Sequence, residues 1–193
     1  MLLLGGRSLL RSPTLRVARA PTLLMAVAAR ALSAPLPRPP SISAAFDSGN
    51  IEVKDVACGS DDAHTFTLKI RPDAYTHGTD KTAHFQWFHF RASGVRGKKC
   101  TFVLENAGAA SYPEGWEDYK TVASYDREDW FRIASTEYED GKLSWTLTPE
   151  RDSVWFAYFA PYSWERHERL VAELSGPGQL GTHTSIGETL EGR

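Results

Sequence analysis

Histidine and acidic side chains are the groups in this sequence that could support metal-assisted hydrolysis. A zinc hydrolase holds its metal with imidazole and carboxylate ligands, often on a short spacing such as HxxE or HExxH, with a third ligand from further along the chain. No histidine here has a glutamate three residues later, and the one HxxD, from His77 to Asp80, falls in a polar turn without an evident partner. The six histidines are His64, His77, His84, His89, His167 and His183.

His84 and His89 are the closest pair on a segment with strand character. Side chains alternate between the two faces of a strand, so residues five apart point in opposite directions. We therefore expect that these two histidines cannot share a metal ion unless a bulge intervenes.

Signals for nucleophilic catalysis and phosphate binding are also missing. The sequence has no GxSxG nucleophile elbow, no GxxxxGK loop and no GxGxxG loop. Cys58 and Cys100 belong to no CxxC or Cys/His pattern, so we predict two small buried or half-buried thiols without a disulfide. Catalytic residues, cofactor-binding residues and metal ligands are therefore assigned to no position of this chain.

Charge divides the chain into two parts. Residues 1–46 contain six arginines and neither lysine nor acid, whereas the remaining 147 residues hold 16 basic and 24 acidic residues, a net charge of -8. Residues 47–193, with this negative charge, would repel nucleic-acid phosphates, which argues against DNA or RNA as a partner.

The first forty residues have the composition of a targeting segment. Arginines interrupt every apolar stretch, which disfavours a secretory signal, and Arg-rich, Ser-containing, acid-poor sequence is typical of an organellar transit peptide. The segment Arg30–Ser33 resembles a matrix-protease cleavage site. We predict that residues 1–40 are a transit peptide for mitochondria or another organelle; if they are instead a disordered tail, or upstream sequence wrongly included in a gene model, the protein would be cytoplasmic. No run reaches the roughly 20 apolar residues of a membrane helix, so no membrane association is expected.

From residue 46 onward, short apolar runs alternate with turn signals. The runs with period two are rich in aromatic and branched residues, as β-strands are. Many short strands without intervening helices predict an all-β fold, an antiparallel β-sandwich over residues 46–161, with Trp87, Phe88, Trp145 and Phe156 in its core. The expected strands are 64–70, 84–90, 100–104, 131–135, 142–148 and 154–159.

Three connections carry local signals. Residues 93–97 are predicted to form a hairpin loop, and Asp140-Gly141 is predicted to form a tight hairpin because this pair tolerates positive backbone angles. The connection from Asn106 to Asp129 is long and aromatic, which favours a segment packed on the sandwich over a binding surface.

A change of period near the end predicts one short helix. Ser163 is a suitable N-cap for a helix from Trp164 to about Leu174, and Glu165 suits the positive end of its dipole. Gly176-Pro177-Gly178 would stop it. We interpret residues 163–193 as a junction helix followed by the start of a further domain.

Several segments together resemble one family, the N-terminal domain of cytosolic carboxypeptidases, and most of all its shorter, bacterial-like members. The resemblance covers residues 46–193. It rests on FDSGNIEV (46–53), QWFHFR (86–91), the stretch from Asn106 through YPEGW (112–116) to VASYDREDWFR (122–132), FAYFAPYSWERHERL (156–170) and SIGETLEGR (185–193).

The resemblance implies a β-sandwich that precedes a carboxypeptidase A-like α/β catalytic domain. SIGETLEGR is similar to the opening strand of that domain, where an IGxSxEGR-like segment is usual, although Thr189 and Leu190 depart from it. In the family, the HPGE-type zinc motif and the other catalytic residues follow this point, so the resemblance transfers none of them to this chain. It implies zinc as the cofactor of the parent family, with none held here, and the catalytic domain as the partner.

Three functions are compatible with these observations. The first is an accessory domain of a zinc metallocarboxypeptidase that removes C-terminal residues such as glutamate from proteins, this chain not being catalytic by itself. The second is a stand-alone β-sandwich that binds proteins or peptides. The third, a carbohydrate-binding sandwich, rests only on the aromatic residues, which core packing explains equally well.

Overall fold

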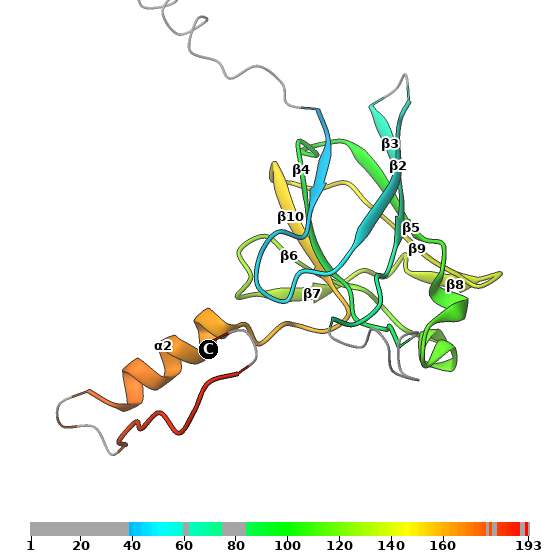
Figure 1. The fold of residues 1–193 in the computed structure, drawn as a ribbon. Coiled ribbons are helices and arrows are strands. Elements are labelled where there is room, and N and C mark those ends of the chain that lie inside the picture. The colour runs from blue at the N-terminus through cyan, green and yellow to red at the C-terminus, as the bar shows by residue number, and fades with distance from the viewer. Residues whose placement is uncertain are drawn as a thin grey trace, which may run out of the picture. The chain divides into compact units, whose positions relative to one another are not determined.

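The computed structural model describes residues 39–59, 62–74, 84–176, 178, 181–189 and 192. The predicted targeting segment, apart from its last two residues, and the His77–Asp80 turn lie outside these residues. Within them the chain forms mostly short strands, two 3₁₀ turns and one α-helix (Figure 1). In chain order they are β1 (Ser41–Ser43), β2 (Glu52–Cys58), β3 (Ala63–Lys69), β4 (His89–Ser93), β5 (Lys99–Leu104), η1 (Ala107–Ala109), η2 (Pro113–Trp116), β6 (Val122–Ser124), β7 (Trp130–Arg132), β8 (Glu137–Glu139), β9 (Lys142–Leu147), β10 (Ser153–Ala157) and α2 (Trp164–Leu174).

The described strands form two five-stranded sheets, which confirms the predicted all-β sandwich. The first sheet has the order β1-β4-β10-β6-β7 and is antiparallel throughout. The second has the order β2-β3-β5-β9-β8. The expectation of purely antiparallel pairing needs one correction, because β3 and β5 run parallel, from Ala63 opposite Lys99 to Leu68 opposite Leu104.

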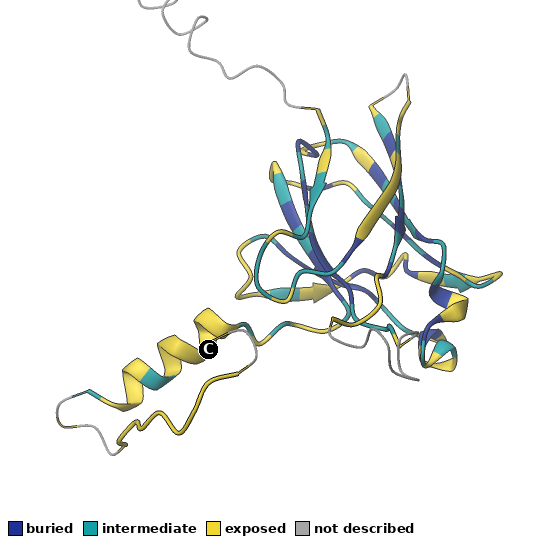
Figure 2. Ribbon diagram, viewed as in Figure 1, coloured by how far each residue is buried: buried dark blue, intermediate teal, exposed yellow. Residues whose placement is uncertain are grey.

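The core lies between the sheets and consists largely of aromatic rings. Phe102 of β5 stacks on Phe66 of β3 at a centroid distance of 4.8 Å and meets Phe156 of β10 at 4.5 Å. Phe88 stacks on Trp145 of β9 at 5.8 Å. Phe88, Trp145 and Phe156 are buried as predicted, and Figure 2 shows burial concentrated on the facing strands. Trp87 was expected in the core but is only half-buried, because its indole nitrogen donates to the Ser48 carbonyl in a surface loop at 2.7 Å.

The segment before β4 is not the long strand that its alternation predicts. Residues 84–88 are irregular and β4 begins at His89. Phe85 and Gln86 bond to the long connection instead: the Ser111 backbone N–H donates to the Phe85 carbonyl at 2.9 Å, and the Tyr112 N–H donates to the Gln86 side-chain oxygen at 3.0 Å. This exchange holds the connection against the sandwich, as its aromatic residues predicted, and buries Trp116 within it.

The two expected hairpins have different outcomes. The Asp140-Gly141 turn joins β8 to β9 with φ values of 49° and 73°, which confirms the tight hairpin. Residues 93–97 instead carry the chain from β4 in one sheet to β5 in the other. Their backbone is tied to the segment before β10, with the Gly97 N–H donating to the Pro149 carbonyl at 2.8 Å.

Helix α2 forms as predicted, from Trp164 to Leu174. The Ser163 hydroxyl accepts from the Arg166 N–H at 3.3 Å, and Ser163 has the extended backbone of an N-cap. No residue of α2 is buried, and Figure 2 shows the helix exposed along nearly all of its length. After the helix, residues 181–189 are exposed and irregular, so the expected opening strand of a further domain is not formed; no neighbouring strand pairs with it among the described residues.

Candidate functional site

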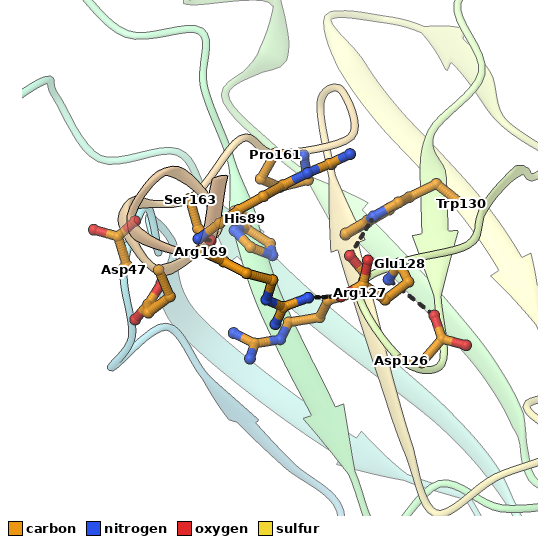
Figure 3. Close-up of a pocket in the computed structure, with 11 residues that line it drawn as sticks. Asp47, His89, Asp126, Arg127, Glu128, Trp130, Pro161, Ser163 and Arg169 are labelled. Carbon is orange, nitrogen blue, oxygen red and sulfur yellow. Dashed lines mark hydrogen bonds and ion pairs between the residues drawn. The ribbon is translucent and has the colours of Figure 1, made fainter. Parts of the chain in front are cut away.

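A pocket lies where helix α2 meets the first sheet. Its cavity measures about 70 Å³, and Figure 3 shows the side chains that line it. Its described lining comes from the loop before β2, from β4, from the β6–β7 turn, and from the start of α2: Asp47, His89, Asp126, Arg127, Glu128, Trp130, Pro161, Ser163, Glu165, Arg166 and Arg169.

The loop before β2 caps the helix. The Trp164 backbone N–H donates to Asp47 Oδ2 at 2.7 Å, beside the Ser163 cap. A carboxylate at this position also complements the positive end of the helix dipole. The N-terminus of α2 is therefore held by residues that lie more than a hundred positions earlier in the chain.

His89 forms the floor of the pocket. It is 2% exposed and lies against Phe46 and Trp130, with ring-centroid distances of 4.8 and 5.9 Å. Its Nδ1 is 2.9 Å from the Ser48 hydroxyl, whereas its Nε2 is buried and has no hydrogen-bond partner in the described structure. Burial and then the nearby Arg127 guanidinium lower the pKa of His89 from 6.5 to about 4, against a raising effect of Asp47. The imidazole is therefore neutral near pH 7.

The β6–β7 turn presents Arg127 from a strained backbone. Asp126 accepts from the backbone N–H groups of Glu128 and Asp129 at 2.9 Å each, and these bonds hold the pKa of its carboxyl below the usual range. The turn places Arg127 at φ 68°, a conformation that side-chain-bearing residues rarely adopt. Glu128 pairs with Arg169 of α2 at 3.2 Å.

The histidines examined as zinc ligands lie apart. His64 is buried in β3 and neither of its ring nitrogens has a partner, His84 is exposed and lies 3.1 Å from the Ser111 hydroxyl, and His89 lies in the pocket. The described part of the chain brings no three histidine, cysteine, aspartate or glutamate side chains together as a metal site. The residues that the structure describes do not fit a zinc ion, and whether the whole chain binds zinc stays a prediction.

The two cysteines, Cys58 and Cys100, lie in different environments. Both are free thiols, and Cys100 is buried as predicted, but the prediction was wrong for Cys58, which is exposed in β2. Burial raises the pKa of the Cys100 thiol to about 11, which makes it unreactive. No helix among the described residues is both long and apolar enough to cross a bilayer.

A comparison with known protein families shows to which family the chain is related. The family model described as cytosolic carboxypeptidase N-terminal domain matches residues 42–159, more than half of the chain. The chain belongs to this family. The resemblance found in the sequence is thereby confirmed, and the family domain coincides with the two sheets.

Solved structures similar to this N-terminal domain are carboxypeptidases. A putative carboxypeptidase from Burkholderia mallei is 41% identical with a TM-score of 0.68, and the match covers 80% of this chain and 37% of that one. A putative carboxypeptidase A from Shewanella denitrificans is 45% identical with a TM-score of 0.68, covering 79% and 38%. A metallo-carboxypeptidase from Pseudomonas aeruginosa, solved with (2-guanidinoethylmercapto)succinic acid, is 42% identical with a TM-score of 0.64, covering 79% and 38%.

An uncharacterized protein of Zymomonas mobilis is 38% identical over 152 residues, which are 79% of this chain and 37% of that protein. The chain thus spans little more than a third of the length of these relatives.

The junction pocket was missed in the sequence because its residues come from segments far apart in the chain. The only local signal was the clustering of arginine with aromatic residues in SYDREDWFR and SWERHERL.

Proposed function

We propose that this domain is the accessory domain of a metallocarboxypeptidase: it packs against the family's catalytic domain, supports its fold, and does not itself hydrolyse peptides. The parent reaction would be zinc-assisted removal of C-terminal residues such as glutamate. The zinc and the catalytic residues would belong to the catalytic domain, since the described residues offer no metal site.

The observation that carries this proposal is the exposure of apolar residues from residue 159 onward. Of the nine large hydrophobic residues that are exposed in the described chain, six lie in this segment: Phe159, Tyr162, Trp164, Leu170, Leu174 and Ile186. Exposed large apolar residues concentrated in one segment are typical of a surface that another domain or protein covers. The solved relatives, of which this chain spans 37–38%, are longer than the matched segment, and this supports the proposal that a further domain covers these residues.

A domain exchange tests the proposal. The matching segment of the Shewanella denitrificans carboxypeptidase is replaced by residues 42–189 of this chain, and soluble yield, thermal midpoint and release of C-terminal residues are measured. The chimera should fold and cleave, whereas the remainder of the relative without an N-terminal domain should be insoluble or inactive.

Charges placed on the apolar face of α2 provide the matched variant. Leu170→Asp with Leu174→Asp should lower the thermal midpoint of the chimera, and Glu168→Lys, which changes an exposed charge on the same helix, should not. A remainder that is as stable and active alone as in the chimera would refute the accessory role.

A stand-alone protein-binding sandwich remains the alternative function, and the same surface would then meet a separate protein. The net charge of -8 over residues 47–193 disfavours acidic protein tails as its ligands. In that case the domain exchange would yield no active chimera.

We also propose that residues 1–40 direct the protein to mitochondria or another organelle. The support is compositional: arginine without acid, and Arg30-Ala31-Leu32-Ser33 at the expected position of a processing site. A fusion of residues 1–40 to a fluorescent protein should be imported and cleaved near residue 33. Diffuse cytoplasmic fluorescence of an uncleaved fusion would contradict organellar targeting and indicate that the protein is cytoplasmic.

A further inference from the structure

Two arginines of the junction pocket have no acidic partner. No ion pair of the described residues involves Arg127 or Arg166, whereas Arg169 pairs with Glu128. The Arg127 guanidinium lies over the Trp155 ring at 5.9 Å and that of Arg166 over the Tyr162 ring at 5.6 Å. Both guanidinium groups thus rest on aromatic rings and keep their hydrogen-bond donors available to a ligand.

The nearby acids are engaged elsewhere, with one exception. Asp47 caps α2, Asp126 holds the β6–β7 turn, and Glu128 bonds Arg169. Glu165, in the first turn of α2, is exposed and lines the same pocket. The engaged acids fix the walls of the pocket, and Arg127 and Arg166 supply its positive charge.

His89 adds a buried polar atom without a partner. Its Nε2 is inaccessible to solvent and unsatisfied, although the side chain lines the cavity. A buried polar group left without a partner destabilises the folded state unless something bonds to it. If the Ser48 hydroxyl donates to Nδ1, the neutral ring carries its proton on Nε2, a donor that has no acceptor in the described structure. Figure 3 shows His89 between the start of α2 and Arg127.

We propose that this junction pocket is a carboxylate-binding site, in which the guanidinium groups of Arg127 and Arg166 hold a carboxylate carried by a peptide or protein beside the His89 ring. Arginine guanidinium matches the planar carboxylate with two parallel hydrogen bonds. A cavity of about 70 Å³ is several times the size that one water molecule requires, so it admits a carboxylate group. The left-handed backbone of Arg127 fits this role, because such strain is found where a side chain must be aimed.

The charge of the lining favours a singly charged carboxylate over a phosphate. Three arginines face four acids in this pocket, and His89 is neutral near pH 7. A dianion would be repelled by these carboxylates, whereas a monoanion gains the directional hydrogen bonds with less repulsion. The site consists only of residues of this chain and does not depend on the proposed docking of a catalytic domain.

Side-chain NMR of the full chain tests the site. The ¹H–¹⁵N signals of His89 and Arg127 are followed at constant ionic strength during titration with acetate, N-acetylalanine, N-acetylglutamic acid α-amide and, as a neutral comparison, N-acetylalanine amide. Acetate and at least one of N-acetylalanine and N-acetylglutamic acid α-amide should give saturating shifts. Tighter binding of N-acetylalanine would identify a C-terminal carboxylate as the ligand, and tighter binding of N-acetylglutamic acid α-amide would identify a side-chain carboxylate. The neutral amide should give none.

Variants then assign the response to the pocket. Arg127→Gln and Arg166→Gln should each weaken acetate binding at least tenfold, and Arg96→Gln, in the exposed loop after the other end of β4, should leave it unchanged. Bound acetate should also raise the pKa of His89, because a negative charge beside the ring favours imidazolium. Shifts that do not saturate, an equal response in Arg127→Gln, or tighter binding of inorganic phosphate than of acetate would overturn the proposal.

Discussion

His89 shows how one residue can matter for reasons that its sequence position does not reveal. In the sequence it was considered only as one of two histidines that could not share a metal ion. In the structure it is the buried floor of the junction pocket, bonded to Ser48 and enclosed by Phe46 and Trp130. Phe46 and Ser48 come from the loop before β2 and Trp130 from β7, and no spacing rule connects these two segments with His89.

The lowered pKa of His89 predicts a pH dependence of stability. Because the folded pKa is about 4 and the ordinary value is 6.5, the unfolded chain takes up a proton in this window that the folded chain does not. The free energy of unfolding should therefore fall as the pH drops from about 6.5 to about 4, by on the order of 3 kcal/mol from this residue. Urea unfolding at several pH values should show the stability difference between wild type and His89→Gln narrowing by that amount between pH 7 and pH 4. Parallel curves for the two proteins would contradict it.

The burial of two tryptophans predicts how much their substitution lowers the free energy of unfolding. Trp145→Ala should lower the free energy of unfolding by about 3–5 kcal/mol, because the 1% exposed ring contacts Phe88, Phe102 and Phe156. Trp87→Ala should cost less, since its ring is half-buried at the edge. Chemical denaturation of the two variants measures the difference, and an unchanged midpoint for Trp145→Ala would mean that β9 packs differently.

Among the elements, those with strong local signals could be predicted from the sequence. The 142–147 strand, the Asp140-Gly141 turn and the Ser163-capped helix each depend on neighbouring residues, and all three form. Two of the strands that were missed, β1 and β6, have three residues each, too few to display a period. β2, with seven residues, was also missed, because polar residues break its apolar alternation. The crossing at residues 93–97 and the parallel β3–β5 pair were missed because both depend on which sheet a strand joins, a choice that long-range packing makes.

A close contact between Gly108 and Gly141 predicts how a substitution in η1 changes the free energy of unfolding. Gly108 in η1 donates its backbone N–H to the Gly141 carbonyl at 2.7 Å, and a Cβ on Gly108 would lie 2.7 Å from the Gly141 Cα. This contact fastens the long connection to the β8–β9 hairpin. Gly108→Ala should therefore lower the free energy of unfolding by about 1–3 kcal/mol. Gly115→Ala, in the same connection but with its nearest neighbour 3.7 Å away, is the control and should change it by less than about 0.5 kcal/mol. Equal stability of the two variants in thermal melts would contradict this account.

The whole molecule combines a well-packed sandwich with an exposed C-terminal segment. The family and the fold could be predicted from the sequence because the motifs QWFHFR, VASYDREDWFR and FAPYSWERHERL occur in order over most of the chain. The junction pocket could not, since it exists only when the segments carrying Asp47, His89, Arg127 and Arg166 fold together. Leu170 and Leu174 leave an apolar face of α2 exposed, and the interpretation of this helix as a junction stays a prediction.

The central claim is that this domain supports a metallocarboxypeptidase and carries no peptidase activity of its own. Metal analysis of the purified, dialysed chain, together with a C-terminal glutamate release assay on the same sample, tests it most directly. Catalytic zinc takes three protein ligands, and the described residues gather no such set. The predicted result is far less than one equivalent of zinc per chain and no chelator-sensitive release of glutamate. One equivalent of zinc held against a weak chelator, with glutamate release that the chelator abolishes, would contradict the account.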